Sequence, residues 1–216
     1  MELVFICGAL RSGTSLLHLV LDAHPDISNP GEFDFLFDGL TDLDEEPCVE
    51  RYIDFLKKNR IFQSKNLAIN PSVKSYRNLN NDLINQIKSP GVLSLNIHRN
   101  FDVAEHYFPH AKFLHVLRDP RDVSLSSIRM GWAGNTYYAV DHWIAAENSW
   151  EKLAVRANSN HLHEIKFEEF ISNPKKTLTK VCEFLGTQYK PQMLSYYKDS
   201  TYDPIDISLI EQWKIL

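Results

Sequence analysis

Short apolar runs alternate with helical patterns along most of the chain. Residues 3–7 form a continuous apolar run that Gly8 closes, which is typical of a strand buried on both faces. Residues 14–23 then carry leucine and valine at helical spacing. Strands that alternate with helices indicate βαβ units, and therefore an α/β fold with a central parallel sheet covered on both faces. Further strands are predicted at residues 91–96, 112–117 and 161–166, and further helices at 101–107, 120–130, 140–157 and 174–185.

The region from residue 41 to residue 90 shows the weakest periodicity. It is polar, with one predicted helix over residues 49–58 and stretches rich in asparagine and serine around residues 66–81. We interpret residues 41–90 as an insertion that carries substrate contacts, within a single domain that covers residues 1–216.

Composition limits the kinds of partner that the chain can bind. The 216 residues are 44% hydrophobic, which suffices for one compact core without disulfides or metals. Lysine and arginine number 23 against 28 acidic residues, giving a net charge of −5. A chain-wide basic field that would hold nucleic acid or an anionic membrane is therefore excluded, and any anion site must be local.

The cysteines and the N-terminus bear on the compartment. Cys7, Cys48 and Cys182 lack CxxC or Cys/His spacing, which argues against a disulfide framework and a structural zinc. The histidines show no HExxH pattern either, so we assign no metal. The first residues lack the basic flank of a signal peptide, and no apolar stretch approaches eighteen residues. We expect a cytoplasmic protein without a membrane anchor.

Residues 8–15 (GALRSGTS) fall between the first predicted strand and the first predicted helix. Backbone N–H groups of such a loop and the helix N-terminus form an anion cradle. The glycines have the spacing of GxxxxGK[ST], but Thr14 occupies the lysine position and the basic residue is Arg11. A kinase uses that lysine on the terminal phosphates, so a small-molecule or nucleoside kinase is the less favoured enzyme class. A glycine turn that only packs strand against helix is the structural alternative.

A second candidate anion site follows the strand at residues 112–117. Arg118 stands at the carboxyl end of that strand, where open α/β sheets bind ligands, and Pro120 suits a helix start. Ser126 lies on the second helical turn, so Arg118 and Ser126 can share a phosphate monoester. An ordinary ion-paired helix N-terminus, with Asp119 and Asp122 balancing the charge, is the alternative.

Together these segments resemble the P-loop sulfotransferase family, which uses 3′-phosphoadenosine 5′-phosphosulfate (PAPS) as the sulfuryl donor. Residues 8–17 look like the family's 5′-phosphosulfate loop, and residues 116–126 look like its 3′-phosphate segment. Residues 21–32 and 166–186 are similar to the tyrosylprotein and bacterial branch. The resemblance implies a three-layer fold related to nucleoside kinases, with PAPS as co-substrate.

The resemblance also implies roles for single residues. Arg11 would contact the sulfate and the 5′-phosphate, whereas Arg118 and Ser126 would hold the 3′-phosphate. Glu32 matches the general base that acts on the acceptor hydroxyl, although a surface carboxylate in a turn is the alternative. The remaining donors of the loop would come from Ser12, Gly13, Thr14 and Ser15.

Departures from the family pattern concern the leaving group and the walls of the site. Where relatives carry a lysine, this chain has His98 and Arg99; His98 can donate the same bond as imidazolium, or it can be a packed histidine. Phe167 replaces a tyrosine near the nucleotide. Trp132 and Tyr137 are expected to be packing residues rather than parts of an acceptor loop. Because of these departures, a nucleotide-binding scaffold without catalytic activity is an alternative to an active enzyme.

The acceptor is expected to bear a hydroxyl and to be a small molecule, a glycan or a peptide. The negative net charge makes a highly sulfated polysaccharide a less favoured acceptor, because such polysaccharides bind to a continuous basic surface.

Overall fold

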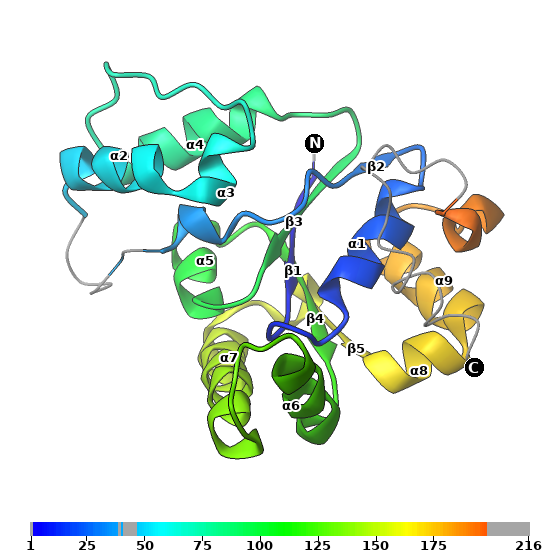
Figure 1. Ribbon diagram of the computed structural model, residues 1–216. Coiled ribbons are helices and arrows are strands. Elements are labelled where there is room, and N and C mark those ends of the chain that lie inside the picture. Colours follow the sequence, from blue (N-terminus) through cyan, green and yellow to red (C-terminus); the bar gives the residue numbers. More distant parts are fainter. Residues whose placement is uncertain (1, 39, 41–46, 198–216) are drawn as a thin grey trace.

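A five-stranded parallel sheet forms the centre of the computed structural model, which describes residues 2–38, 40 and 47–197. The strand order is β2-β3-β1-β4-β5, and every pairing is parallel (Figure 1). The predicted α/β fold with a central parallel sheet is therefore confirmed. The strands are β1 (Glu2–Cys7), β2 (Ile27–Ser28), β3 (Val92–Ile97), β4 (Lys112–Leu117) and β5 (Leu162–Lys166).

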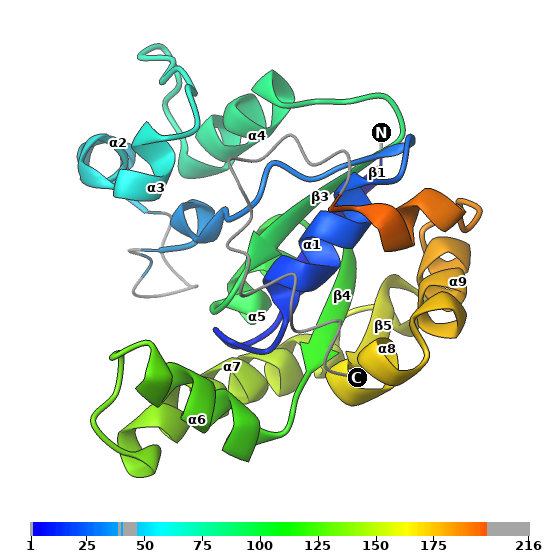
Figure 2. The ribbon, with the colours of Figure 1, turned by 45° about the vertical axis from the view of Figure 1, so that its right-hand side comes forward.

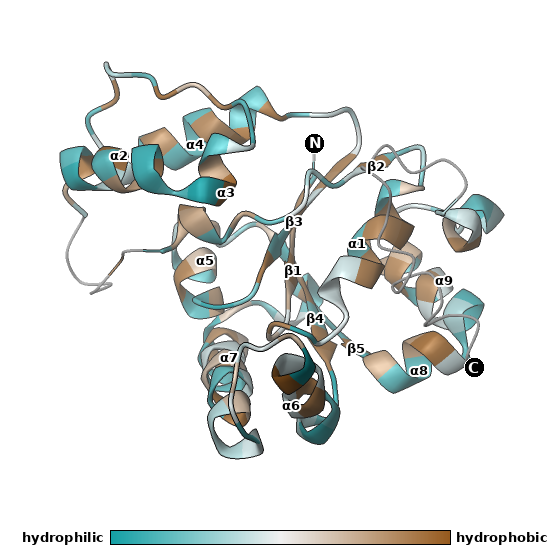
Figure 3. Cartoon of the chain, in the orientation of Figure 1, coloured by the Kyte–Doolittle hydropathy of each residue, from teal (hydrophilic) through white to brown (hydrophobic). Residues whose placement is uncertain are grey.

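Helices cover both faces of this sheet. Helices α1, α8 and α9 lie on one face, whereas α5 and α7 lie on the other, with α2 to α4 extending from that second side (Figures 1 and 2). Helices α2 and α4 alternate hydrophilic and hydrophobic bands, as amphipathic surface helices do (Figure 3). The helices are α1 (Thr14–Asp22), α2 (Val49–Lys58), α3 (Arg60–Gln63), α4 (Tyr76–Gln86), α5 (Phe101–Tyr107), α6 (Pro120–Arg129), α7 (Thr136–Arg156), α8 (Phe167–Ser172) and α9 (Pro174–Phe184).

Strand β1 separates two hydrophobic cores, because successive side chains of a strand point to opposite faces. Phe5 and Cys7 belong to the core beneath α4, α5 and α7. Val4 and Ile6 belong to the core beneath α1 and α9. All four are fully buried, which explains why residues 4–7 of this strand are all apolar.

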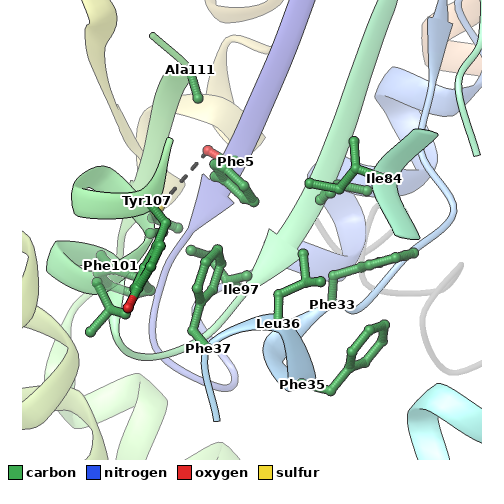
Figure 4. Packing of buried hydrophobic residues seen from close by; sticks show 14 of the residues in the cluster. Phe5, Phe33, Phe35, Leu36, Phe37, Ile84, Ile97, Phe101, Tyr107 and Ala111 are labelled. Carbon is green, nitrogen blue, oxygen red and sulfur yellow. Dashed lines mark hydrogen bonds between the residues drawn. The ribbon is translucent and has the colours of Figure 1, made fainter. Parts of the chain in front are cut away.

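The segment that follows β2 is anchored in the first of these cores. Phe33, Phe35 and Phe37 are fully buried there, and the ring of Phe37 lies 5.5 Å from that of Phe5 (Figure 4). The Tyr52 hydroxyl lies 3.0 Å from the carbonyl oxygen of Phe35. Helix α2 of the predicted insertion therefore holds the segment that carries Glu32 and its neighbours.

Most predicted elements match the observed ones closely, and the helix over residues 49–58 is confirmed. Helix α7 begins at Thr136, four residues earlier than predicted, because Asn135 caps it by accepting from the N–H of Tyr138. Helix α4 was missed by the periodicity. Among the described residues, no helix is long and apolar enough to cross a membrane.

Candidate active site

The loop between β1 and α1 has an unusual backbone. Arg11 and Gly13 both adopt positive φ angles, of 74° and 96°. A Cβ atom on Gly13 would lie 2.3 Å from the ring of Phe167, so only glycine fits this position without a shift. Arg11 is a non-glycine residue in the left-handed region, a conformation that costs energy and is concentrated at functional sites.

The loop ends at the exposed N–H groups of a helix. Gly13 is the N-cap of α1, and no side chain caps this end. The first turn of α1 carries no acidic residue. Because the first N–H groups of a helix have no partner within it and carry partial positive charge, this end of α1 is suited to bind an anion.

The two predicted anion segments meet at Arg11. Its Nε donates a hydrogen bond to Oγ of Ser126 on α6, over 2.9 Å. Nη1 of Arg118, at the end of β4, donates to the carbonyl oxygen of Arg11 over 3.0 Å. The Arg118 guanidinium also stacks on Phe167, with its Cζ 4.4 Å from the ring centroid. The carboxyl ends of β1 and β4 thus bring both basic residues to one place.

Neither guanidinium is neutralised by an acidic side chain of the described residues. Within the described residues, no carboxylate lies within salt-bridge distance of Arg11 or Arg118. Burial lowers the pKa of Arg118, although the more distant carboxylates Asp122 and Glu168 oppose this effect. The carboxylate of Asp119 instead binds Arg121, so an ion-paired helix N-terminus does not account for Arg118.

At this site, two buried polar atoms also lack a partner among the described residues. They are Nε of Arg118 and Oγ of Ser12. A buried donor without an acceptor costs about 1–3 kcal/mol, so native proteins rarely leave one unsatisfied without reason. An oxyanion bound between the loop and β4 would supply the missing acceptors.

A buried histidine closes the other side of the loop. Nε2 of His98, just beyond β3, lies 3.2 Å from Oγ1 of Thr14. Nδ1 of His98 lies 2.8 Å from Oδ2 of Asp34. Burial acts to lower the pKa of His98, but the hydrogen bond and the charge of Asp34 outweigh it and the pKa is raised. The pairing with Asp34 therefore favours the imidazolium form of His98, and its Nε2 faces Oγ1 of Thr14.

Glu32 is fixed by backbone pairing beside β3. It forms a parallel bridge with Asn96, whose carbonyl oxygen accepts from the N–H of Phe33 over 2.8 Å. The preceding turn is braced by Asn29, which accepts from the N–H of Gly31 over 2.8 Å. Nζ of Lys65 donates to the carbonyl oxygen of Pro30 over 2.5 Å. The half-buried Glu32 side chain lines the same pocket as the loop residues.

Most of the predicted site residues line one pocket at this edge of the sheet. Ser12 is fully buried within the loop and Ser126 binds the side chain of Arg11, and neither of them lines the pocket. Arg99, the alternative to His98, points away and donates to Asp38 over 2.7 Å. The predicted residues that line the pocket are Arg11, Gly13, Thr14, Ser15, Glu32, His98 and Arg118.

Some residues of the site were missed or misinterpreted from the sequence. No local sequence pattern indicated a functional role for Asp34, since it lies within the largely apolar run from Phe33 to Phe37. The interpretation of Trp132 and Tyr137 as packing residues is wrong, because they are 50% and 74% exposed. Trp132 lines the pocket, and Cζ of Arg11 lies 5.6 Å from its ring centroid. Phe167 lines it as well, but the sequence indicated only the loss of a hydroxyl there.

Comparison with known proteins agrees with this architecture. A protein from Caenorhabditis briggsae named a putative protein-tyrosine sulfotransferase is 26% identical over 207 residues, covering 91% of this chain and 70% of the relative. The sulfotransferase domain of the olefin synthase from Synechococcus PCC 7002 has a TM-score of 0.69 at 21% identity, covering all of this chain and 88% of that one.

A more distant solved structure is a complex with a nucleotide. Mouse sulfotransferase SULT7A1, complexed with PAP, has a TM-score of 0.53 at 16% identity and covers 91% of this chain and 62% of that one. At these identities the structural matches establish the fold. The model of the sulfotransferase family matches residues 4–191, which is most of the chain. The chain therefore belongs to the sulfotransferase family and is an enzyme that transfers a sulfuryl group.

Proposed function

We propose that this enzyme transfers a sulfuryl group from PAPS to an acceptor hydroxyl by in-line displacement. PAPS is the general donor of the family, and the mouse relative was solved with PAP, the bisphosphate product of such a transfer. The observation that carries the proposal is the pair Arg11 and Arg118. These guanidinium groups meet at one loop without a carboxylate partner among the described residues, and they match a ligand with two separate anionic groups.

The donor's two ends would bind different parts of the site. The 5′ end would lie on the loop, where Arg11, Ser12, Gly13, Thr14 and Ser15 present a guanidinium, hydroxyls and helix N–H groups. The 3′-phosphate would lie against Arg118 and Ser126. Ser126 accepts from Arg11, so its own O–H remains free to donate to a phosphate oxygen. The unpartnered Nε of Arg118 would then gain an acceptor.

The acceptor would approach from the side of Glu32. Glu32 would take the proton of the acceptor hydroxyl as the S–O bond forms. His98 would donate a hydrogen bond from Nε2 to the oxygen from which the sulfuryl group departs, where negative charge develops. Both side chains line the same pocket as Arg11, as a direct displacement requires.

The test is turnover of PAPS by the purified chain with a panel of phenols, sugars, aliphatic alcohols and tyrosine peptides. Glu32→Gln keeps the shape of the side chain but cannot accept the proton, so we expect transfer to slow about 10²- to 10⁴-fold. Affinity for the bisphosphate should stay unchanged. Glu151→Gln, on the exposed side of α7, is the matched control. Full turnover by Glu32→Gln would remove Glu32 from the mechanism.

We propose a reducing, cytoplasmic compartment for the chain, supported by the free thiols of Cys7, Cys48 and Cys182. We also propose that residues 41–90 contribute to acceptor binding. Lys65, which follows α3, supports this assignment because its side chain reaches the turn that carries Glu32.

A further inference from the structure

The contact between Asp34 and His98 uses both oxygens of the carboxylate. Oδ1 of Asp34 accepts from the backbone N–H of His98 over 2.7 Å, and Oδ2 accepts from Nδ1 of His98 over 2.8 Å. The two residues are 2% and 5% exposed. A carboxylate buried this deeply is costly unless it is paired and hydrogen-bonded, so this geometry is fixed rather than transient.

This contact fixes one proton of the His98 ring on Nδ1, so that Nε2 is the nitrogen that faces the pocket. Because Asp34 can only accept when ionised, Nδ1 of His98 must be the donor. Nε2 then faces Oγ1 of Thr14, the first residue of α1. Thr14 stands where kinase-type loops carry a lysine, so the His98 ring supplies the positive charge at this end of the loop.

The charged groups around His98 favour its protonated form. Asp34 and Glu32 approach from the segment after β2, and both favour the cation. Arg99, the next residue along the chain, opposes it but is largely engaged by Asp38. Thr14, from α1, is neutral. His98 in turn lowers the pKa of Asp34 against the effect of burial, so each side chain favours the charged form of the other.

We infer that Asp34 is the positioning residue of His98, fixing its Nδ1 proton and its charge so that Nε2 donates to the departing oxygen. This inference rests on the proposed function. The S–O bond to the 5′-phosphate breaks, and its electron pair stays on the phosphate oxygen. A new S–O bond forms to the acceptor, whose proton passes to Glu32. His98 donates a hydrogen bond throughout and loses no proton, so the step balances without a further reactant.

The kinetic test uses Asp34→Asn, which retains an acceptor for the backbone N–H but removes the charge. We expect kcat to fall about 10- to 100-fold near neutral pH, with bisphosphate affinity nearly unchanged. The basic limb of the pH profile of kcat should move to lower pH, because the cation of His98 is lost earlier. Lowering the pH should then restore part of the rate. A structural role alone would reduce the rate equally at every pH, and that result would overturn the inference.

Asp38→Asn is the matched control, since Asp38 lies on the same segment and contacts Arg99 rather than His98. Its pH profile should keep the position of the wild-type basic limb. His98→Lys supplies a side chain that is cationic without help from Asp34. It should therefore retain more activity than His98→Ala and move the basic limb of the pH profile to higher pH. Loss of the acidic limb instead of the basic one in Asp34→Asn would assign His98 as a base and contradict the inference.

A measurement without turnover separates this inference from the proposed function. Nitrogen NMR of the imidazoles in the wild-type chain should show His98 with a pKa above the ordinary histidine value and with Nδ1 protonated when neutral. Asp34→Asn should lower that pKa. If Asp34→Asn does not fold, the wild-type titration alone decides, and a His98 that titrates at or below the ordinary value would refute the pair. Absence of PAPS turnover would refute the proposed function and leave this titration unaffected.

Discussion

Arg11 and Ser126 are joined by a hydrogen bond of 2.9 Å, although 115 residues separate them in the chain. Arg118 completes this connection by donating to the backbone of Arg11. The loop that would hold the 5′ end of the donor and the helix that would hold its 3′-phosphate are thereby fixed to each other. Such preorganisation reduces the ordering cost of binding a ligand that spans both segments.

Arg11 combines backbone strain with a binding role. At φ 74°, any residue with a Cβ is strained, and glycine is not. We predict that Arg11→Gly is about 1 kcal/mol more stable than Arg11→Ala, while both variants lose most of their affinity for the bisphosphate. Urea unfolding and calorimetric titration measure the two effects. Equal stability of the two variants would show that the strain is absent.

Gly13 supports both the loop and the position of Phe167. Gly13→Ala places a Cβ against a buried ring at a positive φ angle, so we predict a loss of about 2–4 kcal/mol of stability. This corresponds to a melting temperature lower by about 5–15 °C. Gly134→Ala is the control, because its Cβ would meet nothing within 4 Å. A melting temperature for Gly13→Ala as close to wild type as that of the control would contradict the tight contact.

His18 makes the stability of the chain depend on pH. Burial, followed by the charge of Lys65, lowers the pKa of His18 from 6.5 to about 4. Between these values the unfolded histidine binds a proton and the folded one does not, so stability falls as the pH drops through this window. The loss reaches about 3 kcal/mol and does not grow below pH 4.

The comparison of wild type with His18→Gln isolates this effect. Urea unfolding at several pH values should show the wild type losing stability relative to His18→Gln between about pH 6.5 and 4. Above this window the difference between the two proteins should be constant. Parallel stability curves across the whole range would show that His18 does not titrate differently in the folded and unfolded states.

The sheet could be predicted because its central strands β1, β3 and β4 are largely buried. Residues 3–7 are an apolar run and residues 112–117 are apolar apart from Lys112 and His115, and helices follow each of them. Helix α4 escaped prediction because its asparagines weaken the helical pattern. The structure shows why one of them is there: Asn80 is fully buried and donates to the carbonyl oxygen of Leu36 over 3.0 Å. Tertiary contacts, rather than local propensity, place that helix.

The site was predictable where its residues share a loop or a strand end. The motifs at Arg11 and Arg118 each follow a strand, so the parallel sheet brings them together. Asp34 could not be found in this way, because its role depends on a contact with a residue 64 positions away. Trp132 was misassigned because an aromatic residue in a loop gives no indication of whether it is buried or faces a ligand.

We propose that Arg118 binds the 3′-phosphate of the donor. Calorimetric titration of the protein with nucleotides tests this role most directly. Wild type should bind adenosine 3′,5′-bisphosphate more tightly than AMP or Mg²⁺·ATP. Arg118→Ala should lose about 10- to 150-fold in affinity for the bisphosphate and little for AMP. Arg121→Ala, an exposed arginine on the same segment, should behave as wild type. Equal affinity of the wild type for the bisphosphate and AMP, or tighter binding of Mg²⁺·ATP, would contradict the account.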